Sequence, residues 1–210
     1  TLAQLATINF AQSADVLYLA HLSHAPAKLT RTSHTTWTLN DIDFTDGPYL
    51  DENITDTTLY ASANTGSVTI TASADLFAST DVGRLIRFRE ILEINHDEWV
   101  TATSYAANVT IRFNGNVYKQ TTGSTQTSGA TPPVHLEGEE TYGSVDWTYQ
   151  HSATGYVKIT AYTNATTVTA LVKNDTGFLP DHVVASGNAT KKWSLGSFST
   201  TTGFPRAIGF

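Results

Sequence analysis

The sequence predicts an all-β fold, in which propeller-blade-like strands at both ends frame a small β-barrel with an inserted β-module. Thr supplies roughly a sixth of the residues, and Thr together with Val, Ile, Tyr and Phe favours strands. Apolar and polar residues alternate along several short runs, most clearly at 67–72. With 40% hydrophobic and 15% charged residues, the chain has enough apolar surface to form an ordered core.

The composition excludes several classes of function. No Cys occurs, which excludes disulfides and all thiol or Cys-based metal chemistry. Membrane insertion is not expected, because no apolar run approaches roughly 18 residues and the N-terminus lacks the pattern of a signal peptide. The formal net charge of −7 argues against nucleic acid as the main partner, so DNA is expected only as passing cargo. The absence of Met and the apolar, strand-like run 207–210 indicate a piece of a longer polypeptide.

Residues 1–50 are expected to form blade-like β-strands. Two hairpins are predicted there, with turns at 12–15 and 32–34, because strand-forming residues flank each turn. The run DFTDGPY at 43–49 is rich in Asp, Gly and Pro, which predicts a connection to the next unit.

A small, discontinuous β-barrel is predicted for residues 51–98 and 152–185. Residues 75–83 are expected to form a single helical turn closed by Gly83. The predicted barrel strands share an alternating pattern, and they are 67–72, 84–90, 155–161 and 167–172.

Residues 99–151 differ from the flanking segments in their pattern of strands and loops, and they are expected to form the inserted β-module. Asn114-Gly115 predicts a tight hairpin turn, and a loop rich in Gly, Ser, Thr and Pro follows at 123–133. Residues 186–210 are expected to return to blade-like strands.

Four segments carry a resemblance at the two ends of the chain: SADVLYLAH at 13–21, PAKLTR at 26–31, Trp37, and GFPRA at 203–207. They resemble stretches of large phage proteins related to the tail nozzle, or tubular protein B, of short-tailed phages. This resemblance implies propeller blades interrupted by an insert. It also implies location in the virion, and a full-length protein that forms a ring with copies of itself and contacts other tail proteins.

A second resemblance covers the predicted barrel, through SVTITA at 67–72, Phe77, DVG at 81–83, Ile86 and GYVKIT at 155–160. These residues are similar to the first catalytic cysteine half-domain of ubiquitin-activating enzymes. Only the barrel fold is implied, because this chain has no Cys and the half-domain itself supplies no catalytic thiol.

A third resemblance covers the predicted insert, through NGNVYK at 114–119, SGATPP at 128–133 and VDWTY at 145–149. This pattern looks like small chitin-binding-type carbohydrate modules, which hold sugar rings against exposed aromatic faces. The candidate carbohydrate-binding residues that it implies are Tyr118, Tyr142, Trp147 and Tyr149.

Trp147 and Tyr149 lie two positions apart on a predicted strand, so both side chains point to the same face. That face either binds a sugar or forms the core of the module. The core is the favoured interpretation, because a module of roughly 50 residues with few large aliphatic side chains needs its aromatic residues inside. Exposure of both rings favours sugar binding, and burial favours a scaffold.

No metal site, cofactor or enzyme is predicted. The histidines are expected on the surface or in turns, since His21 and His24 would not share a strand face and no HExxH motif occurs. Carboxylates at 96–98 and 137–140 do not establish the facing pair that a glycosidase needs. The seven histidines are His21, His24, His34, His96, His135, His151 and His182.

The expected function is therefore that of a structural component of a tailed-phage virion, similar to a tail nozzle or tubular protein, with a role in assembly and host-surface contact. The alternative is a carbohydrate-binding module that adsorbs to host cell-surface glycans.

Overall fold

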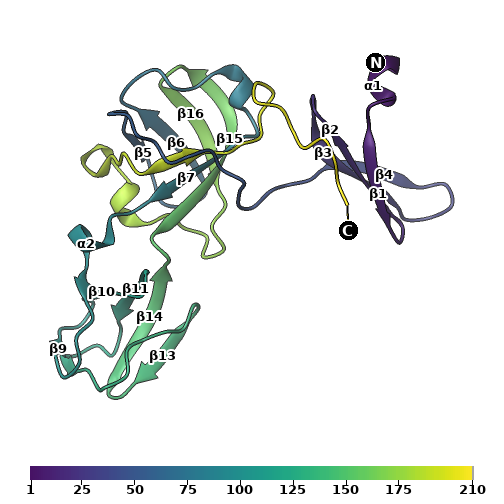
Figure 1. Cartoon of the computed structure of the whole chain (residues 1–210). Helices are drawn as coiled ribbons and strands as arrows, with labels where there is room; N and C mark the ends of the chain where they lie inside the picture. Colours follow the sequence, from purple (N-terminus) through teal and green to yellow (C-terminus); the bar gives the residue numbers. More distant parts are fainter. Residues whose placement is uncertain (210) are drawn as a thin grey trace.

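The computed structural model describes residues 1–209. It confirms the all-β fold, because strands hold 45% of the residues and helices only 8%. Figure 1 shows three units: a four-stranded sheet near both termini, a curled six-stranded sheet, and a five-stranded sheet that projects from the second. We call these units the blade, the barrel and the insert.

The blade is an antiparallel meander in the order β1-β2-β3-β4, so both predicted hairpins are present. Arg31 closes the first turn, because its backbone N–H donates to the Asp15 carbonyl at 2.9 Å and its guanidinium lies 3.0 Å from the Asp15 carboxylate. The elements of this unit are the short helix α1 (Leu2–Leu5) and the strands β1 (Asn9–Ser13), β2 (Val16–His21), β3 (His24–Arg31) and β4 (Trp37–Asp41).

The barrel sheet has the strand order β17-β7-β15-β16-β6-β5 and curls around one core. Alternate residues of each strand point inward, as with Val68 and Ile70 of β6, and Leu179 and Val183 pack against them from a covering segment. The strands are β5 (Leu59–Ala61), β6 (Ser67–Ala72), β7 (Leu85–Arg89), β15 (Thr154–Asn164), β16 (Thr167–Val172) and β17 (Trp193–Leu195).

Three short 3₁₀ helices accompany the barrel, η1 (Ser79–Asp81), η2 (Asp181–Val183) and η3 (Ser186–Asn188). The first lies within the predicted helical turn, and Gly83 follows it with the positive φ of 91° that favours glycine. Within the described part of the chain, no helix is both long enough and apolar enough to cross a membrane.

The insert sheet has the strand order β13-β14-β11-β10-β8. The predicted turn joins β10 to β11, since Asn114 and Gly115 have φ values of 49° and 80°. A second core, separate from that of the barrel, centres on Trp147, Tyr118 and Ile111. The elements are α2 (Leu92–Asn95), β8 (Asp97–Glu98), β9 (Ser104–Tyr105), β10 (Thr110–Phe113), β11 (Asn116–Gln120), β12 (Gln126–Thr127), β13 (Glu139–Tyr142) and β14 (Val145–His151), with β9 and β12 paired in a small ribbon.

The structure corrects two predicted boundaries. Strand β17 lies in the region 186–210 that was predicted to rejoin the blade, yet it pairs with β7 and places Trp193 opposite Phe88 in the barrel core. Strand β8, predicted within the barrel, pairs with β10 of the insert. Residues 207–209 form no strand, and the last residue of that predicted run, Phe210, lies outside the described residues.

The connecting segment and the C-terminal segment both join the blade to the barrel. The Asp43 carboxylate on the connecting segment lies 2.8 Å from the ammonium groups of both Lys158 and Lys173. The C-terminal segment then returns along the blade, where the Phe204 N–H donates to the Leu22 carbonyl at 2.9 Å. Figure 1 shows this segment in yellow beside β2 and β3.

Candidate functional site

One carboxylate and three imidazoles meet where the insert joins the barrel. Glu90 follows β7 and His96 follows α2, both on the segment that enters the insert. His151 ends β14, on the segment that leaves the insert, and His182 lies in η2 of the barrel. We call these four residues the Glu90 cluster.

The backbone around the Glu90 cluster brings the entering and leaving segments side by side. The Glu90 N–H donates to the Ala153 carbonyl at 2.8 Å, directly beside the pairing of β7 with β15. Leu92, Val117 and Ala153 form a small apolar core at the same junction. Local packing therefore fixes the backbone from which the cluster residues project.

The hub of the Glu90 cluster is Glu90 Oε1. It lies 2.9 Å from His96 Nε2 and 2.7 Å from His182 Nδ1, and the Asn95 side-chain amide donates to it at 3.0 Å. The other oxygen, Oε2, is buried without a hydrogen-bond partner among the described residues, and His151 Nε2 lies 3.6 Å from it. The two oxygens of one buried carboxylate are thus unequally satisfied.

The charges within the cluster compensate for burial. Burial raises the pKa of Glu90, but the hydrogen bond with His96 and the attraction that His151, His96 and His182 exert when protonated outweigh it and lower that pKa below its usual value. The Glu90 carboxylate is therefore ionised at neutral pH. Burial lowers the pKa of His151 to about 4, against the opposing effect of Glu90, so this imidazole is neutral at the same pH.

Outer contacts orient two of the imidazoles. Nδ1 of His96 lies 3.0 Å from the Thr110 hydroxyl, and Nδ1 of His151 accepts the Ala153 N–H at 3.2 Å. The rings of His96 and His182 meet edge to face, with their centroids 5.2 Å apart. The contacts of Nδ1 therefore fix the orientation of the His96 and His151 rings, and with it which nitrogen faces Glu90.

Three members of the Glu90 cluster could hold a metal ion. Glu90, His96 and His151 each offer one ligand atom, and these atoms lie within 4.8 Å of one another. A cavity of about 320 Å³ beside them is lined by all three histidines of the cluster and by Asp181. This cavity provides a route by which a small solute reaches the imidazoles.

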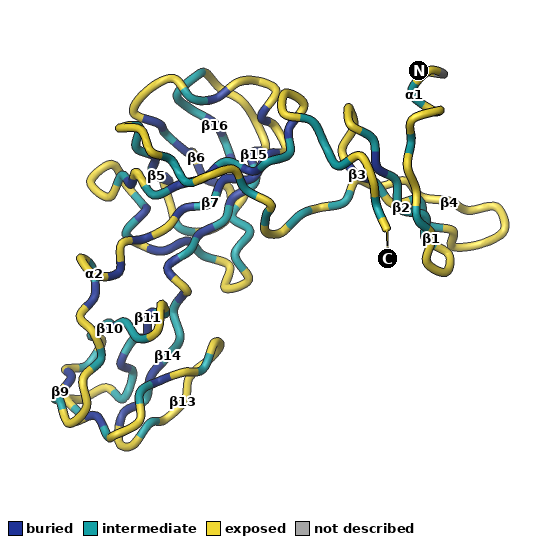
Figure 2. The backbone as a smooth tube through the Cα atoms, in the orientation of Figure 1, coloured by how far each residue is buried: buried dark blue, intermediate teal, exposed yellow. Residues whose placement is uncertain are grey.

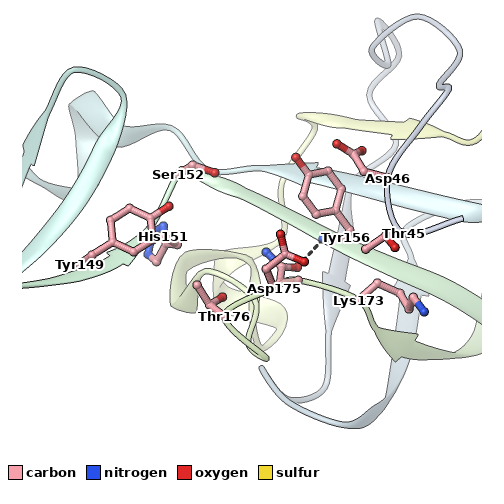
Figure 3. Close-up of a pocket in the computed structure, with 10 residues that line it drawn as sticks. Thr45, Asp46, Tyr149, His151, Ser152, Tyr156, Lys173, Asp175 and Thr176 are labelled. Atoms are coloured by element: carbon pink, nitrogen blue, oxygen red, sulfur yellow. Dashed lines mark hydrogen bonds between the residues drawn. The ribbon is translucent and has the colours of Figure 1, made fainter. Parts of the chain in front are cut away.

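His151 also borders a second cavity, of about 200 Å³, between the insert, the barrel and the blade connection. Figure 3 shows Tyr149 and His151 on its insert side and Tyr156 on its barrel side. Its lining includes the side chains of Asp46 and Asn174, and Asn174 Oδ1 accepts the Tyr156 N–H at 2.6 Å. Because this lining is rich in polar side chains, the cavity suits a small polar ligand.

The four residues predicted to bind carbohydrate lie in or against the insert core. Tyr118 and Trp147 are both 0% exposed, so neither offers a ring face to a ligand. Tyr149 is partly buried and meets Tyr118 edge to face at 5.9 Å, and Tyr142 stacks on His135 at 5.6 Å. Trp147 and Tyr149 do share one face, and that face is directed at the core. No platform made of all four rings is exposed.

The prediction of surface or turn histidines is wrong for His96 and His151, which are 8% and 7% exposed. It is also wrong in separating His21 from His24, which lie opposite each other across β2 and β3 with ring centroids 5.0 Å apart. The Glu90 cluster escaped prediction because its members are scattered over the sequence and only the tertiary fold brings them together.

Three of the acidic residues considered as a glycosidase pair, Glu98, Glu139 and Glu140, are held in surface contacts. Glu98 forms an ion pair with Arg112. Glu139 accepts a hydrogen bond from the hydroxyl of Thr121 at 2.6 Å, and Glu140 accepts one from the hydroxyl of Tyr142 at 2.8 Å.

No protein-family model matches the chain, and no curated protein matches its sequence significantly.

Proposed function

We propose that this chain is a structural module of a larger assembly, of the phage tail nozzle type that its two ends resemble, and that it is not an enzyme. The observation that supports this proposal most is an uncovered apolar face on the blade.

One side of the blade meander carries a continuous set of apolar side chains. Strand register places Leu17, Leu29 and Leu39 in one row across three strands. Because side chains alternate between the two faces of a sheet, residues two positions away along each strand lie on the same side as this row. The most exposed members are Phe10 at 65%, Leu39 at 62% and Trp37 at 53%. We call this set the blade apolar face, and its members are Phe10, Leu17, Leu19, Leu29, Trp37 and Leu39.

The blade has almost no interior of its own. Among residues 9–41, only Ala20 and Pro26 are buried, and none of the apolar core clusters includes a blade residue. Figure 2 shows β4 as exposed along its length, whereas dark blue buried segments concentrate in the barrel and the insert. A single sheet with one bare apolar face gains stability by covering that face, at about 1.5 to 3 kcal/mol for each large side chain.

The partner that best fits the blade apolar face is another blade. Blades of a propeller are four-stranded antiparallel sheets that pack face to face around a centre, and the order β1-β2-β3-β4 is that of one blade. The insert projects away from the blade (Figure 1), which suits a module that is anchored at one end and displayed at the other. Glycan binding by the insert has less support, because Trp147 and Tyr118 are buried.

The proposal is tested in virions encoded by the genome that carries this chain. Antibodies against the insert are expected to label one end of the tail in electron micrographs. Leu39→Asp, which puts a charge on the blade apolar face, is expected to prevent incorporation of the protein into virions. Thr38→Asp is the matched control, because Thr38 is the neighbouring exposed residue on the opposite side of β4.

Two outcomes contradict the proposal. The first is the absence of label from purified tails. The second is normal incorporation of the Leu39→Asp protein, which would mean that the blade apolar face is not an assembly surface.

A further inference from the structure

We propose that the Glu90 cluster binds one divalent transition metal ion of the zinc type, which cross-links the barrel and the insert. The proposal does not depend on the assembly role, because it concerns a different surface and a different readout.

The donor set selects the class of metal. His96 Nε2, His151 Nε2 and one Glu90 oxygen are the three ligands, and His182 Nδ1 is the fourth. Imidazole and carboxylate donors in fourfold coordination suit Zn²⁺, whereas Ca²⁺ and Mg²⁺ require mostly oxygen ligands.

The spacing of the donors fits a tetrahedral ion. Bonds of about 2.0 Å separate the ligands of such an ion by about 3.3 Å. The Glu90 oxygens and the facing imidazole nitrogens are 2.7 to 3.6 Å apart. The ligand atoms of Glu90, His96 and His151 lie within 4.8 Å of one another, so side-chain adjustment brings these three donors around one centre. His182 Nδ1, 2.7 Å from Glu90 Oε1, is the donor nearest to the fourth position.

The second observation is the unsatisfied Glu90 oxygen. The Glu90 side chain is 0% exposed and its Oε2 has no hydrogen-bond partner among the described residues, although Oε1 has three polar neighbours. Buried carboxylate oxygens are expensive to leave unpaired. A cation between Oε2 and His151 Nε2, which are 3.6 Å apart, satisfies both this oxygen and the imidazole that faces it.

Ring protons decide which nitrogen is free for the metal. When His96 Nε2 is the ligand, the ring proton sits on Nδ1, which then donates a hydrogen bond to the Thr110 hydroxyl 3.0 Å away. For His151, coordination through Nε2 places the ring proton on Nδ1, so the 3.2 Å hydrogen bond from Ala153 is given up. The loss of one long hydrogen bond is small beside the binding of a structural zinc ion.

The position of the site gives the ion a structural role. Its ligands come from the entering segment, the leaving segment and η2 of the barrel, while the barrel and the insert have separate cores. An ion held by all three segments fixes the insert relative to the barrel. The cavity lined by the three histidines gives the ion access from solvent.

The test uses the whole chain after removal of metal with a chelator. Titration with Co²⁺ is expected to give one ion per chain with the intense visible absorption of tetrahedral cobalt, and Zn²⁺ is expected to displace it. Zn²⁺ is also expected to raise the Tm and to slow proteolysis at 91–95, and a chelator should reverse both effects.

Variants locate the site. Glu90→Gln and His96→Gln are each expected to weaken Co²⁺ binding by at least about tenfold. The matched control is His24→Gln, because His21 and His24 form the other close histidine pair, on the surface of the blade. Should the buried substitutions unfold the chain, His182→Gln replaces a partly exposed ligand and is expected to weaken binding with an unchanged circular dichroism spectrum.

The proposal is overturned if the folded wild-type chain binds no Co²⁺ or Zn²⁺ when either ion is in excess. It is also overturned if a folded His96→Gln or His182→Gln variant binds as tightly as the wild type, or if His24→Gln abolishes binding.

Discussion

Gly155 of β15 lies directly against the segment that covers the barrel core. A Cβ atom added there would lie 2.6 Å from Leu179 Cδ2 and 3.0 Å from Pro180 Cδ. We expect Gly155→Ala to lower the free energy of unfolding by about 1 to 3 kcal/mol, because the added methyl group overpacks a filled core. Equilibrium urea unfolding measures the change. Gly187→Ala, where a Cβ meets nothing within 4 Å, is the control and is expected to change it by less than about 0.5 kcal/mol. Equal effects would show that Leu179 moves aside freely.

Single residues also show where prediction from sequence ends. The shared face of Trp147 and Tyr149 was predictable, because alternation along a strand is a local property, and burial then decided between core and platform. His96 and His151 gave no such signal. Their environment depends on Glu90 and on the crossing of distant segments, which no local pattern encodes.

Among the elements, the segment between blade and barrel depends on Asp43. Hydrogen bonds from Lys158 and then Lys173 lower the pKa of Asp43 below its usual 3.8. The stabilisation is therefore complete above pH 3.8 and is lost as the pH falls through the lowered value. We expect Asp43→Asn to cost at most about 1 kcal/mol at pH 7, because the carboxylate is largely exposed, and to cost progressively less in acid.

Urea unfolding at a series of pH values measures this effect. Asp51→Asn is the control, because Asp51 is an exposed carboxylate without an ion pair among the described residues, and its substitution is expected to be neutral. A penalty for Asp43→Asn that stays constant at acid pH would contradict the assignment.

Hairpins were the most predictable elements, since their strands and turns are adjacent in sequence. Asn114-Gly115 joins β10 to β11 as expected, because both residues tolerate positive φ. Strand β17 was misplaced for the opposite reason. It consists of three residues, and its membership of the barrel is set by pairing with β7, far away in the chain.

On the scale of the whole molecule, separate cores predict separate unfolding. Trp147 fills the insert core and contacts Tyr105 edge to face at 5.2 Å, whereas Trp193 lies in the barrel core. We expect Trp147→Ala to destabilise the insert by about 3 to 5 kcal/mol and to leave the metal-free barrel unaffected.

Indole N–H signals in a urea titration followed by nuclear magnetic resonance measure this directly. The native signal of Trp99, which packs against the insert core, is expected to vanish at lower urea in the variant, and that of Trp193 at the same urea as before. Loss of both signals together would mean that barrel and insert unfold as one cooperative unit.

A hydrogen bond joins the Glu90 N–H to the Ala153 carbonyl, across the two ends of the insert. It closes the barrel at the mouth of the insert, directly beside the pairing of Arg89 with Thr154. The barrel sheet is therefore continuous without any residue of the insert. Another module whose two ends lie equally close together can be exchanged for this one, in evolution or by design, without changing a single pairing of the barrel that carries it.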